Sequence, residues 1–285
     1  MPGSTHAEAV EFIQIIFLNE HRTKEEKNKI AFPIVDPRKS YNRPFTIEEL
    51  SYSLRKFSSK APGPGNIPIR FIKEIPLSKL PCLLAFYNFI WENGFPHQWR
   101  SAVVIPILKV GKPAKEIESY RPIALTSSVC KVMERIVVAR LQQFLVREKI
   151  LAKHQSGFRA GHSTMDALSI LETDVRRVLN QDDFCLCVLM DISNSFDTVW
   201  HHGLLEKLKN MKVEGQLPSY IQHFHTALRI RVKNEGILSE TYPLTASVPK
   251  GAVLSPTLVN VIINDIFIGC PNSLEMSLFA DDGAM

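Results

Sequence analysis

Two segments of this chain run directly into aspartate, and this arrangement constrains the fold more than any other feature. Residues 184–190 form an unbroken apolar run that ends at Asp191, and the partly apolar segment 274–280 leads into Asp281 and Asp282. The first run indicates a strand buried on both faces, although the pattern also fits a buried helical segment. Two such strands, each ending in aspartate, could bring three carboxylates together from distant parts of the sequence.

Three converging carboxylates predict a metal site. Neighbouring like charges repel each other, so a fold that gathers them needs a cation to compensate. If the site has room for phosphate oxygens, the expected ion is Mg²⁺, and Mn²⁺ could replace it. Two such ions about 4 Å apart would support in-line displacement at phosphorus. The alternative is that Asp191 only ends a core strand and that Asp281 and Asp282 form a solvated, frayed end.

Seven sequence blocks accompany these aspartates in a fixed order. They are APGPGNIP (61–68), WRSAVVIPILKVGKP (99–113), SYRPIALTSSVCKVMERIVVARL (119–141), HQSGFRAGHSTMDAL (154–168), MDISNSFDTVW (190–200), SVPKGAVLSPTLVNVIINDI (247–266) and FADD (279–282). Each block alone is a weak signal, but the series resembles the reverse transcriptase domain of non-LTR (LINE-like, jockey-type) retrotransposons over nearly the whole chain.

The resemblance implies an α+β, right-hand polymerase fold, with fingers and a partial palm whose antiparallel sheet packs on helices, and with the thumb absent. The expected divisions are an N-terminal helix and linker (1–45), an N-terminal extension and fingers (46–182) and an incomplete palm (183–285). The reverse transcriptase domain as a whole would span residues 61–285.

The resemblance also implies an activity and its catalytic residues. The reaction would be RNA-directed DNA synthesis, in which dNTPs are added to the 3′-hydroxyl of a DNA primer on an RNA template. Asp191, Asp281 and Asp282 would be the catalytic metal ligands, and Ile192 would join them in the metal site.

Nucleotide contacts are expected around a basic hairpin and a glycine turn. Cations near the base of the hairpin, Lys109 and Arg121, could offset the charge of a triphosphate, unless they are simply solvated loop cations. Phe196 would exclude a 2′-hydroxyl by steric contact, or would be only a core aromatic. Lys250 and Gly251 would lie against the nucleotide.

Nucleic-acid contacts are expected in two glycine-containing loops. Gly63 and Gly65 belong to the first loop, and Gly157, Arg159 and His162 belong to the second, where loop amides and a helix N-terminus suit a phosphate backbone.

Several positions depart from the family pattern. His162 replaces the usual arginine, Lys250 a glutamine and Ala252 a serine, while Asn194 and Ser195 replace lysine and alanine. Gly65 and Asn66 stand where Asp-Gly is usual. These departures are typical of drift in a decaying copy of a mobile element.

Local patterns predict further elements. Strands are expected at 102–108 and 119–125 and in a hairpin around 234–236, and helices at 5–19, 46–57, 128–148, 163–179, from His201 and after Pro256. The helix at 163–179 would turn Leu168, Leu171, Val175 and Val178 inward. Residues 24–43 would be a linker, and Cys185 and Cys187 would lie in the core.

Composition sets broad limits. Lys and Arg number 34 against 29 Asp and Glu, which gives a net charge of +5 and suits a protein that binds a polyanion. Five cysteines without metal-site spacing indicate a reducing environment. The sequence shows no signal peptide or membrane-spanning segment, so we expect an intracellular protein without a membrane partner; nucleus or cytoplasm and the oligomeric state stay open.

The position of the aspartate pair raises a question about activity. We expect no strand to return from Asp281 and Asp282, and therefore expect a mobile turn and little polymerisation by these residues alone. The alternative function is a catalytically inactive remnant that only binds nucleic acid. A nuclease using the same carboxylates would need neither Phe196 nor the basic hairpin.

Overall fold

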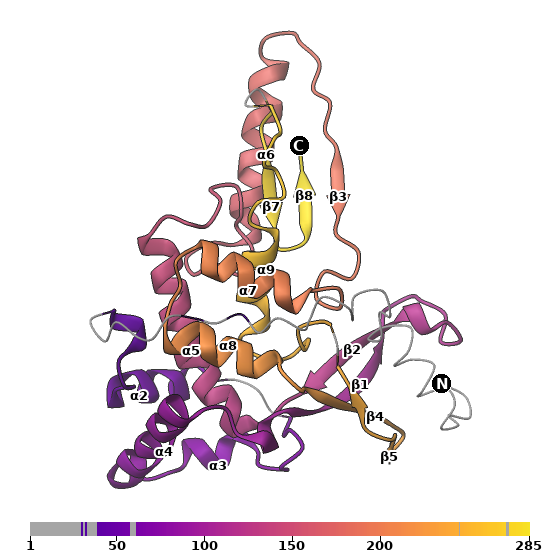
Figure 1. Cartoon of the computed structure of the whole chain (residues 1–285). Coiled ribbons are helices and arrows are strands. Elements are labelled where there is room, and N and C mark those ends of the chain that lie inside the picture. The colour runs from indigo at the N-terminus through magenta and orange to yellow at the C-terminus, as the bar shows by residue number, and fades with distance from the viewer. Residues whose placement is uncertain (1–29, 31, 33–38, 58–60, 245, 272–273) are drawn as a thin grey trace.

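A computed structural model describes residues 30, 32, 39–57, 61–244, 246–271 and 274–285 (Figure 1). The predicted helix at 5–19 and most of the predicted linker lie outside these residues. The helices are α2 (Ile47–Arg55), α3 (Ile69–Lys73), α4 (Leu80–Asn93), α5 (Ser128–Arg147), α6 (Thr164–Leu179), α7 (His201–Asn210), α8 (Gln216–His225) and α9 (Ser255–Ile263). The strands are β1 (Ser101–Leu108), β2 (Tyr120–Leu125), β3 (Leu189–Asp191), β4 (Arg229–Asn234), β5 (Ile237–Leu238), β6 (Tyr242–Pro243), β7 (Ser277–Phe279) and β8 (Asp282–Ala284).

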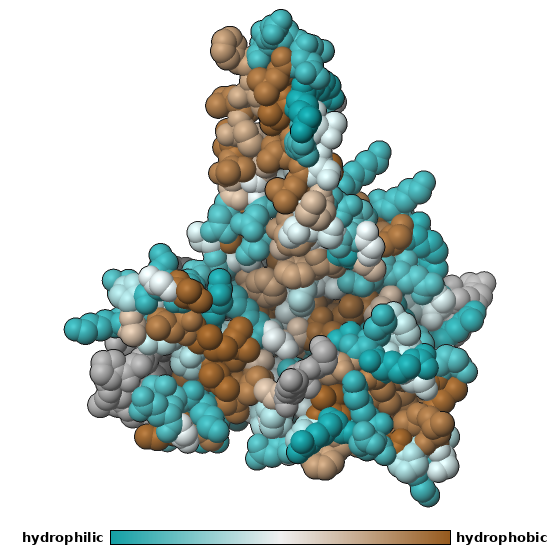
Figure 2. All heavy atoms as spheres, turned by 180° about the vertical axis from the view of Figure 1, so that it is seen from behind, coloured by the Kyte–Doolittle hydropathy of each residue, from teal (hydrophilic) through white to brown (hydrophobic). Residues whose placement is uncertain are grey.

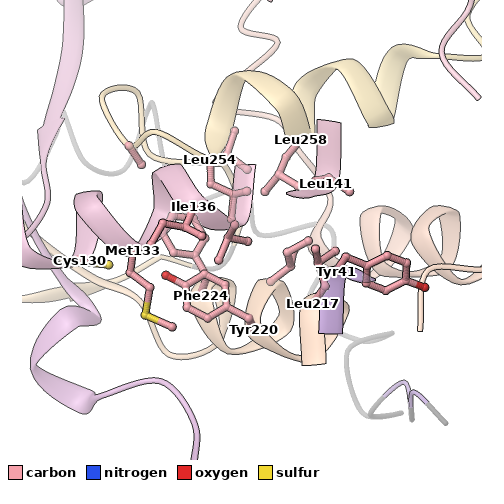
Figure 3. Packing of buried hydrophobic residues seen from close by; sticks show 14 of the residues in the cluster. Tyr41, Cys130, Met133, Ile136, Leu141, Leu217, Tyr220, Phe224, Leu254 and Leu258 are labelled. Carbon is pink, nitrogen blue, oxygen red and sulfur yellow. The ribbon is translucent and has the colours of Figure 1, made fainter. Parts of the chain in front are cut away.

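The main core is built around α5. Ser127 caps this helix by accepting the backbone N–H of Cys130, and apolar side chains then recur at helical spacing. Figure 3 shows them packed against α8 and α9; the labelled residues are Tyr41, Cys130, Met133, Ile136, Leu141, Leu217, Tyr220, Phe224, Leu254 and Leu258. The predicted helix at 128–148 and its buried stripe are confirmed, as are the capping box and helix that begin at Thr46.

Arg140 ties the segment before α2 to this core. Its guanidinium donates to both carboxylate oxygens of Glu49, at 2.7 and 2.8 Å, and to the backbone carbonyls of Tyr41, Arg43 and Pro44. Part of the predicted linker is therefore ordered and buried, because one cation satisfies its carbonyls.

A five-stranded sheet has the order β2-β1-β4-β5, with β6 paired to β4 (Figure 1). The predicted hairpin is confirmed, since β1 and β2 pair in antiparallel fashion from Val103 and Leu125 to Leu108 and Tyr120. The turn predicted around 234–236 joins β4 and β5. The sheet is mixed, because β4 runs parallel to β1.

A second sheet of three antiparallel strands has the order β3-β8-β7. Here the sequence-based expectation of a missing return strand is wrong. Residues Asp282–Ala284 form β8, which lies between β3 and β7 and pairs with both. The turn that carries the two aspartates is thus held by strands on either side.

Two predictions of burial are also wrong. The run 184–190 forms a strand only from Leu189, and Phe184 and Leu186 are 96% and 86% exposed. Cys185 and Cys187 are exposed as well.

Helix α6 forms as predicted, but none of its residues is buried. It packs beside β7 on a part of the molecule that projects from the main core, and its apolar side chains gather on that projection in Figure 2. The apolar pattern predicted α6 correctly, but the strands of this sheet have only three residues each and are too short to cover the apolar side chains of α6. Within the described residues, no helix has the length and apolar character needed to cross a membrane.

We expect Arg140→Met to destabilise the fold by about 3 kcal/mol, because it leaves Glu49 and three carbonyls without their buried cation. Arg147→Met is the matched control on the same helix, since Arg147 is half exposed, lies over the Phe144 ring and pairs with the adjacent Glu148 at the surface. Urea unfolding would measure both variants, and equal midpoints would contradict the assigned role of Arg140.

Candidate active site

The three-stranded sheet brings the predicted carboxylates to one edge. Asp191, the last residue of β3, is the register partner of Asp282, the first residue of β8. One step further, the Ile192 N–H donates to the Asp281 carbonyl at 3.0 Å. The backbone pairing therefore places Asp191 and Ile192 beside Asp282 and Asp281, as the sequence predicted.

The β7–β8 turn is tight. Phe279 pairs with Asp282, so Ala280 and Asp281 alone form the loop of the hairpin. Ala280 has φ +57°, a left-handed conformation in which a small side chain causes the least strain. Adjacent residues of a straight strand point to opposite faces, so Asp281 and Asp282 could not converge in one. The turn changes the direction of the chain between them and removes this restriction.

Ser195 orients one of the carboxylates. Its hydroxyl, which is buried, donates to Oδ2 of Asp281 at 2.7 Å. The sequence treated Ser195 only as a departure from the family pattern. In the structure this departure adds a hydrogen bond from the β3–α7 loop to the aspartate turn.

The electrostatics of the site fit a cation. The pKa of Asp282 is raised first by partial burial and then by the negative charges of Asp281 and Asp191. A bound divalent ion would remove this repulsion, and carboxylate oxygens are the ligands that Mg²⁺ prefers. Within the described part of the chain, no three His, Cys, Asp or Glu side chains are gathered closely enough to hold an ion as they stand.

Gln155 fixes the backbone of the turn that carries Asp281 and Asp282. It is 1% exposed, its Oε1 accepts the Ala280 N–H at 3.0 Å, and its Nε2 donates to the Ala280 carbonyl at 3.2 Å. The same Oε1 accepts the N–H of Gly157 at 2.7 Å. One buried amide therefore satisfies both backbone groups of Ala280 and joins the turn to the loop before α6.

The loop around Gln155 packs against the turn through backbone. A Cβ on Gly157 would lie 2.0 Å from the Ala280 nitrogen, so only glycine fits. The Gly157 carbonyl accepts a hydrogen bond from Asn260 of α9 at 2.8 Å. Arg159, predicted to contact nucleic acid, donates to the carbonyls of Ala152 and Gln155 and so braces its own loop.

Phe196 follows Ser195 in the β3–α7 loop. It is partly buried against the main core, and its ring meets that of Phe158 edge-on, with centroids 6.0 Å apart. Its carbonyl accepts the N–H of Val248. Phe196 is therefore both packed in the core and partly accessible, so its two predicted roles are compatible.

The side chain of Lys250 forms an ion pair within the protein. Its ammonium pairs with the carboxylate of Asp197, which is buried. The pKa of Asp197 is raised by burial, and the positive charges of Lys250 and Lys109 oppose that rise. Lys109 also donates to the Glu118 carbonyl at 2.9 Å, closing the base of the β1–β2 connection. Two of the three predicted nucleotide cations, Lys109 and Lys250, thus act on one buried acid.

The turn containing Gly251 is fixed to β2 and α5. Gly251 has φ +117°, and a Cβ there would lie 2.5 Å from the Ala124 carbonyl oxygen. Glu134, fully buried on α5, accepts the N–H groups of Val253 and Leu254 at 2.7 and 3.1 Å. Burial raises the pKa of Glu134, and these N–H donors oppose that rise. The carboxylate caps the start of α9 and so positions the 250–252 turn.

The remaining predicted contacts are spread more widely. Arg121 is exposed on β2, and His162 and Gly65 are exposed in their loops. Gly63 is buried, and a Cβ there would lie only 2.1 Å from the Thr126 carbonyl oxygen.

No role was assigned to Gln155 or Glu134 from the sequence. Two features of the sequence could have identified them: Gln155 is a polar residue in a glycine-containing loop, and Glu134 is an acid on the apolar face of a predicted helix.

Comparison with known proteins gives the same assignment. Residues 109–285 match the reverse transcriptase (RNA-dependent DNA polymerase) family. The chain is 34% identical over 256 residues to the probable RNA-directed DNA polymerase from transposon BS of Drosophila melanogaster, covering 85% of this chain and 28% of that protein. It is 33% identical over 248 residues to the RNA-directed DNA polymerase from mobile element jockey of the same species, covering 84% of this chain and 27% of that protein.

A solved structure of apo telomerase from Candida tropicalis, truncated from the C-terminal domain, is also similar, with a TM-score of 0.45 and 13% identity over 70% of this chain and 47% of that one. The chain spans little more than a quarter of the length of the two Drosophila polymerases. On the family match, this chain belongs to the reverse transcriptase family.

Proposed function

We propose that this chain supplies the fingers and palm of an RNA-directed DNA polymerase from a non-LTR retrotransposon. It would transfer dNTPs onto the 3′-hydroxyl of a DNA primer, using an RNA template and two divalent ions, Mg²⁺ or Mn²⁺. The observation that carries the proposal is the pairing of Asp191 with Asp282 across β3 and β8, beside Asp281.

Asp191, Asp281 and Asp282 would hold the ions, with Ile192 at the same edge. When bound, two such ions lower the pKa of the attacking hydroxyl and stabilise the leaving pyrophosphate. The protein's own task is to keep the three carboxylates in place, and Ser195 and Gln155 do so through the hydrogen bonds described above.

The incoming nucleotide would lie between Phe196 and the β1–β2 hairpin. Arg121, which is exposed, would meet the triphosphate, while Lys109 and Lys250 would add positive charge from their positions around Asp197. The Phe196 ring would lie under the sugar, where a 2′-hydroxyl would collide with it.

A second candidate function is nucleic-acid binding without catalysis. It is favoured by the spacing of the acidic side chains, since no three in the described residues are gathered closely enough to hold an ion unaided. The two candidate functions differ in one measurable respect. A polymerase needs the Asp191 carboxylate for dNTP incorporation, whereas a protein that only binds nucleic acid does not.

Asp191→Asn should reduce dNTP incorporation on an RNA template by at least about a hundredfold, because it removes one carboxylate from the ion site. Salt-sensitive RNA binding should be unchanged, since it depends on cations elsewhere. Primer extension with Mg²⁺ and fluorescence anisotropy would measure the two properties. Asp183→Asn is the matched control, because Asp183 is also exposed and lies six residues before β3 begins. Asp191-independent incorporation, or RNA binding with no incorporation by the unaltered chain, would reject the polymerase proposal.

Phe196→Val should lower the preference for dNTPs over ribonucleotides by about one to two orders of magnitude, because the smaller side chain leaves room for the 2′-hydroxyl. The measurement is the ratio of kcat/KM for the two nucleotides. Phe71→Val, at an exposed position on α3, is the control. A preference that is the same in both variants would show that Phe196 is only a core residue.

Gln155→Leu should lower kcat for dNTP incorporation by roughly a hundredfold, because loss of the amide frees the Ala280 turn and misplaces the carboxylates. The KM for dNTP should change little, since Gln155 does not reach the nucleotide site. Gln155→Glu, which keeps the acceptor for the two N–H groups, should recover part of the rate. Gln143→Leu, exposed on α5, is the control. Equal losses in the leucine and glutamate variants, or a change confined to KM, would argue against a positioning role.

A further inference from the structure

Helix α9 carries three polar side chains on one face. Thr257, Asn260 and Asn264, the C-cap residue, follow one another at intervals of three and four residues, which places them on the same side of the helix. Thr257 and Asn260 are buried, and Asn264 is partly buried. The rest of the helix is mainly apolar and packs in the main core. Buried polar groups destabilise a fold unless they form hydrogen bonds, so the partners of these three residues indicate the role of this face.

The two asparagines hold the loop between α5 and α6. The Nδ2 of Asn260 donates to the Gly157 carbonyl at 2.8 Å. Asn264 satisfies two backbone groups, because its Oδ1 accepts the Ala152 N–H at 2.8 Å and its Nδ2 donates to the Ile150 carbonyl at 2.9 Å. The α5–α6 loop is therefore attached to α9 at several points along its length.

The same loop is also attached to α5. The Nε2 of Gln142 on α5 donates to the Phe158 carbonyl at 3.3 Å and to the Thr257 hydroxyl at 3.1 Å. One amide thus joins α5, α9 and the α5–α6 loop, so the loop is fixed to two helices of the main core.

The α5–α6 loop in turn holds β7 and the aspartate turn. The Leu278 N–H donates to the His154 carbonyl, and the Ser156 N–H donates to the Leu278 carbonyl, both at 2.8 Å. Gln155, between these two residues, holds Ala280 through the two hydrogen bonds described above. The loop therefore connects α9 to the aspartate turn.

The start of α9 adjoins the proposed nucleotide site. The turn at 250–252 comes just before the helix, and the Ser255 hydroxyl donates to the Pro249 carbonyl at 2.9 Å. Glu134 caps the same end, as described above. Because an α-helix rises about 1.5 Å per residue, Asn260 lies about 8 Å along the axis from Ser255. Helix α9 therefore sets a fixed distance between the 250–252 turn and the α5–α6 loop.

We propose that Asn260 is a positioning residue for nucleotide incorporation, and that it fixes the aspartate turn relative to the 250–252 turn. It acts through the carbonyl of Gly157 and the amide of Gln155. This separation matters because a misplacement of about 1 Å in a reacting group can lower a rate by about a hundredfold. The inference rests on the proposed function, which defines the nucleotide side of the arrangement.

The hydrogen bonding of Asn260 supports a role beyond packing. The side chain is buried, and its Oδ1 has no hydrogen-bond partner among the residues that the structure describes. An apolar residue at this position would avoid the desolvation penalty of that oxygen. The asparagine is therefore explained by the hydrogen bond that its Nδ2 donates to the loop, rather than by the packing of α9.

The test measures backbone amide exchange by NMR in the unaltered chain and in Asn260→Leu, which keeps the branching of the side chain but cannot donate a hydrogen bond. The N–H of Ala280 should exchange about tenfold faster in the variant, because the loop that supplies its acceptor is loosened. The N–H of Leu254, which Glu134 holds at the start of α9, should exchange at an unchanged rate. In primer extension, kcat should fall by about tenfold, while the KM for dNTP should change by less than about twofold.

Two further variants test the route through the loop. Gln155→Leu removes the acceptor of the Ala280 N–H, so the double variant Asn260→Leu/Gln155→Leu should exchange this proton no faster than Gln155→Leu alone. Gln142→Leu removes the attachment to α5 and should also accelerate exchange at Ala280, by about threefold. It decides the question even where Asn260→Leu does not fold.

The matched controls are Asn88→Leu and Gln143→Leu. Asn88, on α4, accepts the Phe45 N–H at 2.6 Å and donates to the Phe45 carbonyl at 3.1 Å, so its loss removes a structural asparagine far from the α5–α6 loop in the sequence. Gln143 is exposed and follows Gln142 on α5. Neither control should change the exchange rate of Ala280 relative to that of Leu254.

Unchanged exchange at Ala280 in both Asn260→Leu and Gln142→Leu would overturn the inference. So would equal acceleration at Ala280 and Leu254, which would indicate general destabilisation, or a loss of kcat in Asn88→Leu as large as that in Asn260→Leu. Exchange is measured without nucleotide or template. A chain that fails to polymerise would therefore reject the proposed function, while the exchange rates would still decide whether Asn260 positions the turn.

Discussion

The arrangement of the site depends on the antiparallel pairing of β3 with β8. A strand of three residues contributes little stability alone, yet it sets the register that places Asp191 beside Asp282. A shift of one residue would turn every side chain of the strand to the opposite face. The β3 and β7 strands on either side of β8 oppose such a shift, because both would have to move with it.

Buried polar side chains supply the precision that such short strands lack. Gln155 satisfies both backbone groups of Ala280, and Glu134 satisfies two N–H groups at the start of α9. Each group would carry a desolvation cost of about 1–3 kcal/mol if it were left unpaired, so the observed positions of the two turns are favoured over nearby alternatives. Glu134 lies on α5 and Gln155 in the loop that follows it, so this part of the chain supports both turns.

Sequence reasoning predicted the elements better than their burial. The helical spacing of Met133, Ile136 and Leu141 predicted α5 correctly, but it did not predict that the first half of the helix is buried on all sides, with Cys130 to Glu134 all buried. The apolar run at 184–190 identified where a strand ends but not how much of it pairs, since pairing depends on the length of β8. Leu189 is 75% exposed although it pairs with Ala284, so the exposure of this run reflects an uncovered face of the sheet rather than missing strand pairing.

The site shows the same division. The sequence showed locally that each aspartate stands at a strand end or in a turn, and the long-range pairing of β3 with β8 then places Asp191 beside Asp282. The support from Gln155 joins positions 125 residues apart, and no local pattern specifies that a glutamine will meet the backbone of Ala280. Such contacts are set by the packing of the loop before α6 against the turn, which the sequence alone does not define.

The Lys250–Asp197 pair shows how a departure from the family pattern can be accommodated. A lysine introduced beside a buried carboxylate gains a partner at once, and the carboxylate is relieved of part of the cost of burial. The ammonium is then held toward the protein rather than toward solvent. A positive charge at position 250 therefore stabilises the loop that carries Phe196, and in the proposed nucleotide site it would act on a triphosphate as a fixed charge rather than as a free side chain.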